Sequence, residues 1–154
     1  MSWASCPTHA TVSILSYAAF MIAAVGGGAY LFVEWYEPLR QLENFREEMQ
    51  SFRLKTNLIY MMVGVVFLGA GIALGAIRAK LLWGTYWSWE AKESTTLFVW
   101  AYYTITAGVL AAHFKFPEKN YAKIASALAL GGIPLIILNG VVVNFFVSSL
   151  HRYL

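Results

Sequence analysis

The segment Asn57–Ile77, NLIYMMVGVVFLGAGIALGAI, contains no charged residue. At ~1.5 Å per residue, a helix of this length reaches across a hydrocarbon core of roughly 30 Å. Three further apolar runs have a similar length, at residues 11–33, 95–114 and 124–150. The sequence therefore predicts an all-α polytopic membrane protein, in which four transmembrane helices form a single membrane domain over residues 1–154.

The composition supports a membrane protein and argues against other classes. Hydrophobic residues make up 59% of the chain and charged residues only 12%, whereas charged residues make up about 25% of an ordinary soluble domain. Cys6 is the single cysteine, which excludes an internal disulfide and any Cys-x-x-Cys site within the chain. The net charge of +3 does not predict a nucleic-acid partner, because the Lys and Arg residues lie in short loops between apolar runs.

The distribution of basic residues predicts the orientation of the spans. Residues 1–8 contain no Lys or Arg, so we expect the first span to be retained and not cleaved as a signal peptide. Seven of the 11 Lys and Arg residues lie in segments 34–55 and 115–123, which are therefore predicted to be cytoplasmic. Segment 34–55 has apolar residues at helical spacing, as in an amphipathic helix or a cytoplasmic extension of the span. Both termini and segment 81–96 would then lie on the non-cytoplasmic side.

Segment 81–96, LLWGTYWSWEAKESTT, is rich in tryptophan and follows the second span directly. An aromatic belt at the membrane interface is the ordinary explanation of such a composition. A second explanation starts from the spacing of Trp83, Tyr86 and Trp87, which in a short helix would share one face and form a flat apolar wall. With the polar side chains of Glu90 and Lys92 at its edge, this wall would suit a flat amphiphilic ligand.

The three histidines lie at the ends of predicted spans. His9 precedes the first span and His151 follows the fourth, so four helices would bring both to the level of the tryptophans. Two imidazoles beside an aromatic platform resemble, in outline, a bis-histidine heme site. His113 lies near the cytoplasmic end of the third span, where an ionisable residue is a functional candidate, although the nearby Lys115 is also consistent with an interfacial role.

Four pieces of the sequence together resemble one protein family. WGTYWSWEAKESTT is similar to the tryptophan-rich signature W-G-x-Y-W-x-W-D-P-K-E-T of the CcsA (ResC) heme-handling proteins of cytochrome c biogenesis, which the related CcmC and CcmF proteins share. HATVSILSYAAFMIAAVGGGAYL resembles the family helix that begins with an external heme-ligating histidine, and GVVVNFFVSSLHRYL resembles the closing helix that ends in a second one. His113 stands about where the family carries a histidine within the membrane.

The resemblance implies a role for each of these positions. His9 and His151 would be the axial ligands of an external heme b. The porphyrin would rest on a platform formed by Trp83, Gly84, Tyr86, Trp87, Trp89 and Glu90. His113 would ligate or help pass on a second heme, whose other ligand a CcsB-like (ResB-like) membrane partner would supply. The substrate would be an apocytochrome c with a Cys-x-x-Cys-His segment, whose thiols add to the heme vinyl groups, so the chain would be part of a holocytochrome c synthase.

The sequence departs from the family pattern in the signature and in length. Glu90, Ala91 and Ser94 stand where the signature has Asp, Pro and Thr. Four spans would form a minimal version of the family, because its members usually carry additional helices before the first histidine. Two alternatives therefore stay open, a b-type heme subunit for electron transfer in a respiratory complex and a structural subunit anchored by its tryptophans. The expected location is a bacterial or archaeal plasma membrane or a thylakoid, with the heme site on the non-cytoplasmic side.

Overall fold

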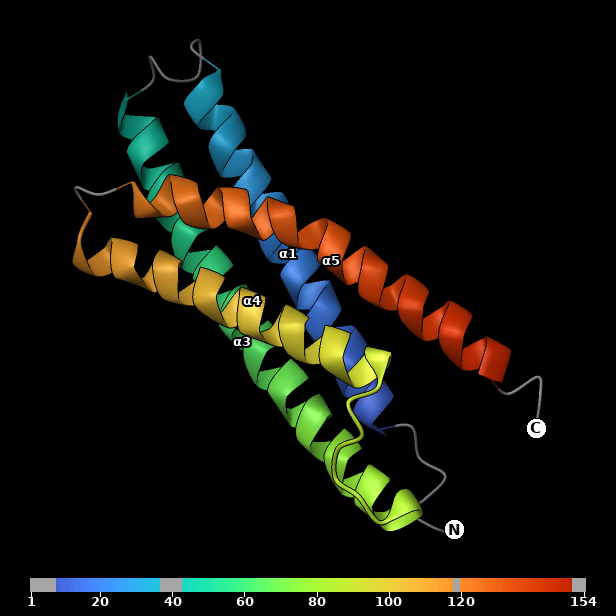
Figure 1. The fold of residues 1–154 in the computed structure, drawn as a ribbon. Coiled ribbons are helices and arrows are strands. Elements are labelled where there is room, and N and C mark those ends of the chain that lie inside the picture. Colours follow the sequence, from blue (N-terminus) through green and yellow to red (C-terminus); the bar gives the residue numbers. More distant parts are fainter. Residues whose placement is uncertain (1–7, 37–42, 118–119, 151–154) are drawn as a thin grey trace.

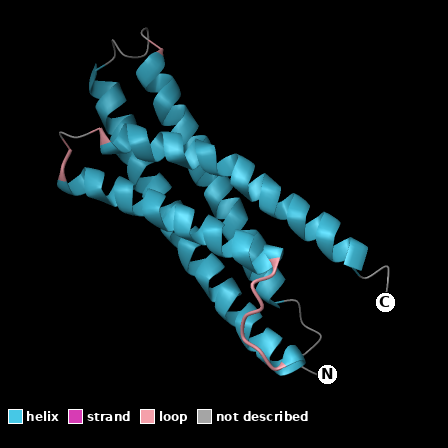
Figure 2. Cartoon of the chain, viewed as in Figure 1, coloured by secondary structure: helices cyan, strands magenta, loops and turns pink. Residues whose placement is uncertain are grey.

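The described part of the chain is helical. The computed structural model describes residues 8–36, 43–117 and 120–150, and the side-chain surroundings of residues 11–36, 50–90, 92–117 and 120–140. Four helices are present in these residues, namely α1 (Thr8–Trp35), α3 (Glu43–Trp83), α4 (Ala91–Lys115) and α5 (Tyr121–Leu150) (Figures 1 and 2). No strand occurs within these described ranges, and the predicted all-α fold is confirmed.

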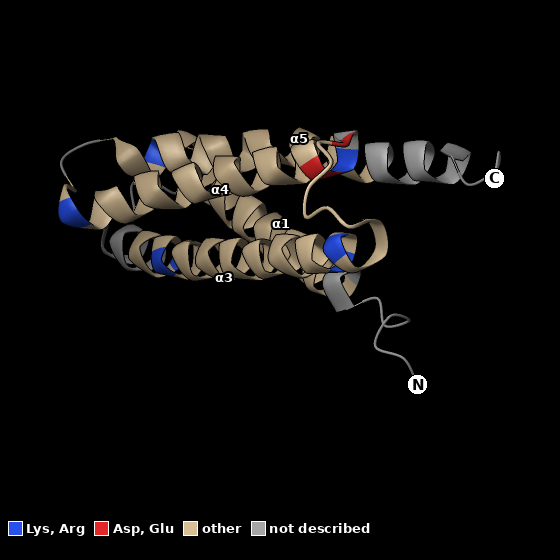
Figure 3. Cartoon of the chain, turned by 60° about the horizontal axis from the view of Figure 1, so that its bottom comes forward, with Lys and Arg blue, Asp and Glu red and all other residues tan. Residues whose placement is uncertain are grey.

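Each of the four helices contains a stretch that is long and apolar enough to cross a membrane. In the described residues these stretches are Thr11–Trp35, Gln50–Trp83, Lys92–Lys115 and Tyr121–Gly140. Figure 3 shows the coloured charged residues near the two ends of the bundle, with an uncharged middle between them. Such a middle is what a hydrocarbon core requires, because an unpaired charge there is unfavourable. The chain is therefore an integral membrane protein.

Successive helices run in opposite directions, so the bundle has two distinct ends (Figure 1). The start of α1, the end of α3, the start of α4 and the end of α5 point toward one end, which carries the loop of residues 84–90. We call this segment the Trp-rich loop and this end the loop end. Helices α1 and α4 each pack against both α3 and α5. The end of α3, the Trp-rich loop and the first turns of α4 therefore all lie at one end of the bundle.

Aromatic rings and glycines hold the middle of the bundle together. Phe20 of α1 stacks on Tyr103 of α4, with ring centroids 3.9 Å apart and an interplanar angle of 9°. Both side chains are fully buried. Gly64 of α3 lies against the Phe20 ring so closely that a side chain there would collide with it. This close approach explains one of the glycines in the spans, as expected for helices that pack in lipid.

Helices α4 and α5 are joined by two neighbouring tyrosines. The Tyr102 hydroxyl donates to the carbonyl oxygen of Leu128 at 2.8 Å, and the Tyr103 hydroxyl donates to that of Ala129 at 3.4 Å. Such bonds satisfy hydroxyl groups that would otherwise lie unpaired in an apolar environment.

The second half of the predicted amphipathic segment 34–55 begins the second long helix. Residues 43–55 are the first turns of α3, which continues without a break into the span that ends at Trp83. Glu34, at the end of α1, accepts a hydrogen bond from Gln50 of α3 at 2.7 Å and pairs with Lys123 of α5 at 3.1 Å. These contacts tie three helices together at the end opposite the Trp-rich loop.

Candidate functional site

The Trp-rich loop begins where a glycine ends α3. Gly84 has a φ of 78°, a left-handed conformation that glycine adopts without steric cost. Its N–H donates to the Lys80 carbonyl at 3.0 Å, and its own carbonyl accepts from Lys80 Nζ at 2.7 Å. The Lys80 ammonium also lies 5.2 Å from the centroid of the Tyr86 ring. Residues 84–90 are not helical, so the short helix considered from the tryptophan spacing is wrong.

The far end of the loop is fastened to the first turn of α4. Oε2 of Glu93 accepts hydrogen bonds from both the backbone N–H and the hydroxyl of Ser88, at 2.8 and 3.1 Å. Between them, Trp89 has a φ of 57°, which is unusual for a residue with a bulky side chain. Helix α4 then starts at Ala91, and the first position of a helix is one that favours proline. This position is where the family signature has its Pro.

The two tryptophan rings in the middle of the loop do not lie in one plane. Trp87 and Trp89 meet edge to face, with centroids 5.9 Å apart and an interplanar angle of 78°. Trp89 is 74% exposed, whereas Trp87 is half-buried. The physical reason is the positive φ of Trp89, which interrupts the regular extended backbone in which side chains two residues apart would point the same way. Only one of these two rings therefore turns toward the protein.

A cavity of about 410 Å³ lies beneath the loop, between it and the helices. Helix α3 contributes small residues to its wall, namely Gly71, Gly75, Ala76 and Ala79. Trp83 and Trp87 supply large aromatic surfaces, and Ser13 lines the cavity from α1. A Cβ atom added at Gly75 would meet no atom within 4 Å, so this part of the wall is open. A wall of small residues and aromatic rings suits an apolar molecule.

Charged and hydrogen-bonding groups also line this cavity. Arg78, Glu90, Lys92 and Glu93 come from the end of α3 and the start of α4. Nε1 of Trp87 is buried and has no acceptor in the described part of the chain. A buried donor without a partner is unfavourable in an empty protein, and it is suited to a ligand that brings an acceptor. The cavity can therefore hold a molecule that is apolar over most of its area and anionic at one edge.

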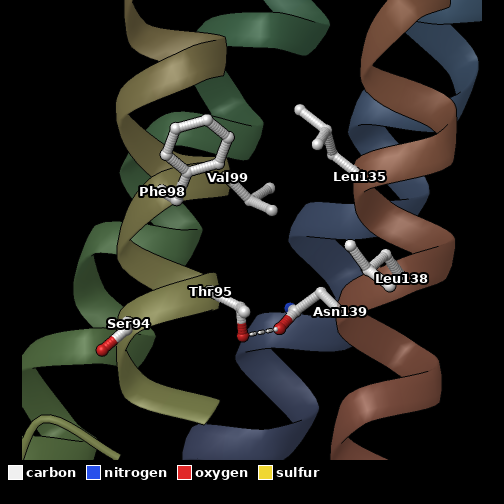
Figure 4. Close-up of a pocket in the computed structure, with 7 residues that line it drawn as sticks. All are labelled: Ser94, Thr95, Phe98, Val99, Leu135, Leu138 and Asn139. Atoms are coloured by element: carbon white, nitrogen blue, oxygen red, sulfur yellow. Dashed lines mark hydrogen bonds between the residues drawn. The ribbon is translucent and has the colours of Figure 1, made fainter. Parts of the chain in front are cut away.

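A second, smaller cavity lies between α4 and α5. It has a volume of about 200 Å³ and is lined by Ser94, Thr95, Phe98, Val99, Leu135, Leu138 and Asn139 (Figure 4). The Thr95 hydroxyl donates to Asn139 at 2.7 Å, as the dashed line shows, and the Asn139 amide donates to the Tyr17 hydroxyl of α1 at 2.5 Å. Asn139 is only 2% exposed. This chain of hydrogen bonds joins three helices just inside the loop end.

The structure places the three histidines differently. His9 lies in the first turn of α1, four residues before the cavity residue Ser13. His151 lies outside the described residues, directly after the end of α5 at Leu150. His113 lies in the last turn of α4, at the opposite end of the bundle from the Trp-rich loop. Its Nδ1 is buried and has no partner among the described residues. No group of three or more His, Cys, Asp or Glu side chains within these residues could hold a metal ion.

The sequence prediction included most of the loop residues but missed others that line the cavity. Trp83, Trp87 and Glu90 line it, whereas Gly84, Tyr86 and Trp89 belong to the loop and are not among its lining residues. Arg78 and the small residues of α3 were not among the predicted site residues. Arg78 directly follows the predicted span 57–77, where a basic residue is expected from membrane topology alone. The helical spacing of Gly71 and Gly75, with Arg78 three residues further along, was the signal that could have placed them on one face.

These features define a class, a helical membrane protein with a tryptophan-lined cavity at one end of its bundle. The family model for the cytochrome C assembly protein matches residues 6–151. The chain belongs to this family, and its relatives are CcsA-type proteins of cytochrome c biogenesis.

Individual relatives agree over nearly the whole chain. The cytochrome c biogenesis protein CcsA of Prochlorococcus marinus (strain MIT 9215) is 28% identical over 94% of this chain and 52% of its own length. CcsA of Mesostigma viride is 26% identical over 94% of this chain and 53% of its own length. Protein NrfI of Wolinella succinogenes is 28% identical, and there the match covers 15% of the relative. The chain thus spans about half the length of the CcsA relatives it matches. No solved structure matched the chain.

Proposed function

We propose that this protein binds heme b at the loop end and presents it for covalent attachment to an apocytochrome c. The observation that carries the proposal is the cavity beneath the Trp-rich loop, with aromatic and small residues on its walls and ionic groups at its rim. Membership of the cytochrome c assembly family supports the same function. The residues fit the group, because a porphyrin is flat and apolar with two carboxylates on one edge.

Helix geometry supports His9 as one of the two proposed axial ligands. Residues four apart in a helix share a face, and His9 stands four positions before Ser13, which lines the cavity. His9 therefore lies on the same face of α1 as the cavity residue Ser13, one turn closer to the N-terminus of the helix. His151 is proposed as the second ligand from the family resemblance, since it directly follows α5, which runs toward the loop end.

The remaining site residues would bind and orient. Trp83 and Trp87 would contact the porphyrin face, Gly84 would set the turn into the loop, and Tyr86, Trp89 and Glu90 would lie toward the external side where the substrate docks. When bound, heme supplies the vinyl groups to which the two thiols of a Cys-x-x-Cys-His segment add. The chain supplies position and exclusion of water, so no side chain need act as a nucleophile.

We propose a second, partner-dependent role for His113. Its half-buried ring carries a buried Nδ1 that finds no partner in the described part of the chain, and an unpaired polar atom at such a place is unfavourable. A CcsB-like membrane protein would complete a site for a second heme there, as the family resemblance implies. Co-expression with such a partner should then add a heme signal that disappears in His113→Ala. The same signal surviving in that variant would contradict the assignment.

The test of the proposed function has a spectroscopic and a chemical part. The purified chain, loaded with heme b, should have a low-spin Soret spectrum that is lost or shifted in His9→Ala and in His151→Ala and is partly restored by imidazole. Unchanged low-spin spectra in both variants would contradict the proposed ligands, and a protein that binds no heme would favour the structural anchor. The chemical part measures covalent attachment of heme to a Cys-x-x-Cys-His reporter in membranes. A protein that presents heme should support this attachment, whereas a b-type electron-transfer subunit would leave the reporter unmodified.

A further inference from the structure

We infer that Arg78 binds a carboxylate of the heme, with the indole N–H of Trp87 as a second donor to that acidic edge. This inference rests on the proposed function and adds a binding residue outside the tryptophan-rich signature. Arg78 lies five residues before Trp83, on the last turns of α3, and lines the cavity beneath the Trp-rich loop together with Trp87.

The side chains of Arg78 and Trp87 both lack a hydrogen-bond partner among the described residues, which supports the binding of an anionic group. The Arg78 side chain is half-buried, and in the residues that the structure describes its guanidinium forms neither an ion pair nor a hydrogen bond. Trp87 contributes a buried N–H that also has no acceptor there. Arg78 and Trp87 line the same cavity, and a cation and an N–H donor are both satisfied by the same kind of group, an anionic oxygen.

The carboxylates on the same cavity wall do not serve as the anionic partner of Arg78. Glu93 already accepts two hydrogen bonds from Ser88, so its Oε2 is held toward the loop. Glu90 is exposed and makes no capping hydrogen bond with its side chain. The start of α4, close to both, adds the positive end of a helix dipole and the ammonium of Lys92. The cavity rim is therefore favourable to one more anionic group beside Arg78.

The lining of the cavity favours a carboxylate on a flat apolar molecule over the phosphate of a lipid headgroup. Arg78 stands three residues after Gly75, where the wall is open, so apolar space and the cation lie on adjoining turns of one helix face. The Trp87 ring lines the same cavity. A ring system in this cavity would meet the same lining that contains Arg78, so an acidic substituent would have a cation to pair with.

The experiment compares heme b with its dimethyl ester, which has the same ring but no free carboxylate. Both are titrated into the purified full chain and into Arg78→Gln, Arg78→Lys and Trp87→Phe, with Lys55→Gln as the control for an exposed cation of the same helix far from the cavity. The wild type should bind heme b more tightly than the ester. Arg78→Gln should weaken heme b on the order of tenfold and leave the ester unchanged. Arg78→Lys should retain part of the preference, and Trp87→Phe should show a smaller loss that is confined to heme b.

Several outcomes would overturn the inference and can be told apart. If the wild type binds both porphyrins equally, or if Arg78→Gln weakens both equally, then no carboxylate is bound at Arg78 although heme binding stands. If Arg78→Gln instead releases a co-purified anionic phospholipid, measured by native mass spectrometry, and the heme-to-ester preference is unchanged, the anion is a lipid phosphate. A wild-type chain that binds neither porphyrin would refute the proposed function and this inference with it. The wild-type comparison needs no variant, so it holds even if Arg78→Gln folds poorly.

Discussion

Glu93 holds Ser88 by two hydrogen bonds to a single carboxylate oxygen, one from the backbone N–H at 2.8 Å and one from the hydroxyl at 3.1 Å. Glu93 lies in the first turn of α4, while Ser88 lies between the two tryptophans of the Trp-rich loop. The position of the Trp87 ring over the cavity therefore depends on a carboxylate in the neighbouring helix.

The first prediction concerns this contact. Glu93→Ala should release the loop, since both bonds are lost and charge-assisted bonds contribute about 1.5–3 kcal/mol each at most. We expect faster proteolysis within residues 84–90 and lower heme occupancy at normal membrane abundance. Thr85→Ala, an exposed change in the same loop, is the control and should alter neither. Equal proteolysis rates in the wild type and Glu93→Ala would show that the contact does not hold the loop.

The second prediction tests the cavity by filling it. Gly75→Leu should abolish most heme binding, because Gly75 lines the cavity and its Cβ position is open, so the added side chain occupies space beneath the loop. Gly108→Leu is the matched control, since Gly108 is an exposed helical glycine that also has open space around it and does not line the cavity. Both variants should keep wild-type abundance and melting temperature. Heme titration measures the difference, and equal heme affinity in the two variants would place the ligand elsewhere.

The third prediction separates the two tryptophans of the loop. Trp87→Ala should weaken heme binding more than Trp89→Ala, because Trp87 lines the cavity and is half-buried while Trp89 is 74% exposed. A buried aromatic contact contributes about 0.5–1.5 kcal/mol beyond its area, so a difference of several-fold in Kd is expected. Trp89→Ala should instead reduce transfer to the Cys-x-x-Cys-His reporter at saturating heme. The reverse order of heme affinities would contradict this assignment.

The fourth prediction concerns stability near the loop end. Asn139→Leu removes the two hydrogen bonds that Asn139 makes with the hydroxyls of Thr95 and Tyr17. The expected loss is about 0.5–2 kcal/mol, in the range measured for interhelical hydrogen bonds in membranes. Thermal unfolding in detergent measures it, with Leu138→Ala as the control for an exposed residue one position away. A melting temperature of Asn139→Leu at or above the wild-type value would show that these bonds do not stabilise the bundle.

The sequence was sufficient for the four spans because hydropathy over some twenty residues is a local and additive signal. It was not sufficient for the Trp-rich loop, whose shape depends on single contacts such as those of Lys80 with Gly84 and Glu93 with Ser88. No periodicity encodes these contacts. The Arg78 position was missed for a related reason, since a charge near a membrane boundary has a ready topological explanation. The cavity is lined by residues from the end of α3 and the start of α4, so it can be recognised only when the positions of both helices are known.

The paired tyrosines of α4 have a consequence for where the loop sits. Because Tyr102 and Tyr103 donate to consecutive carbonyls of α5, a slide of α5 along its axis by one residue, about 1.5 Å, would break both bonds at once. The two helices therefore have one preferred vertical register, set in the middle of the bilayer. Since the Trp-rich loop leads directly into α4, the height of its attachment point relative to α5 is set by these two bonds within the membrane.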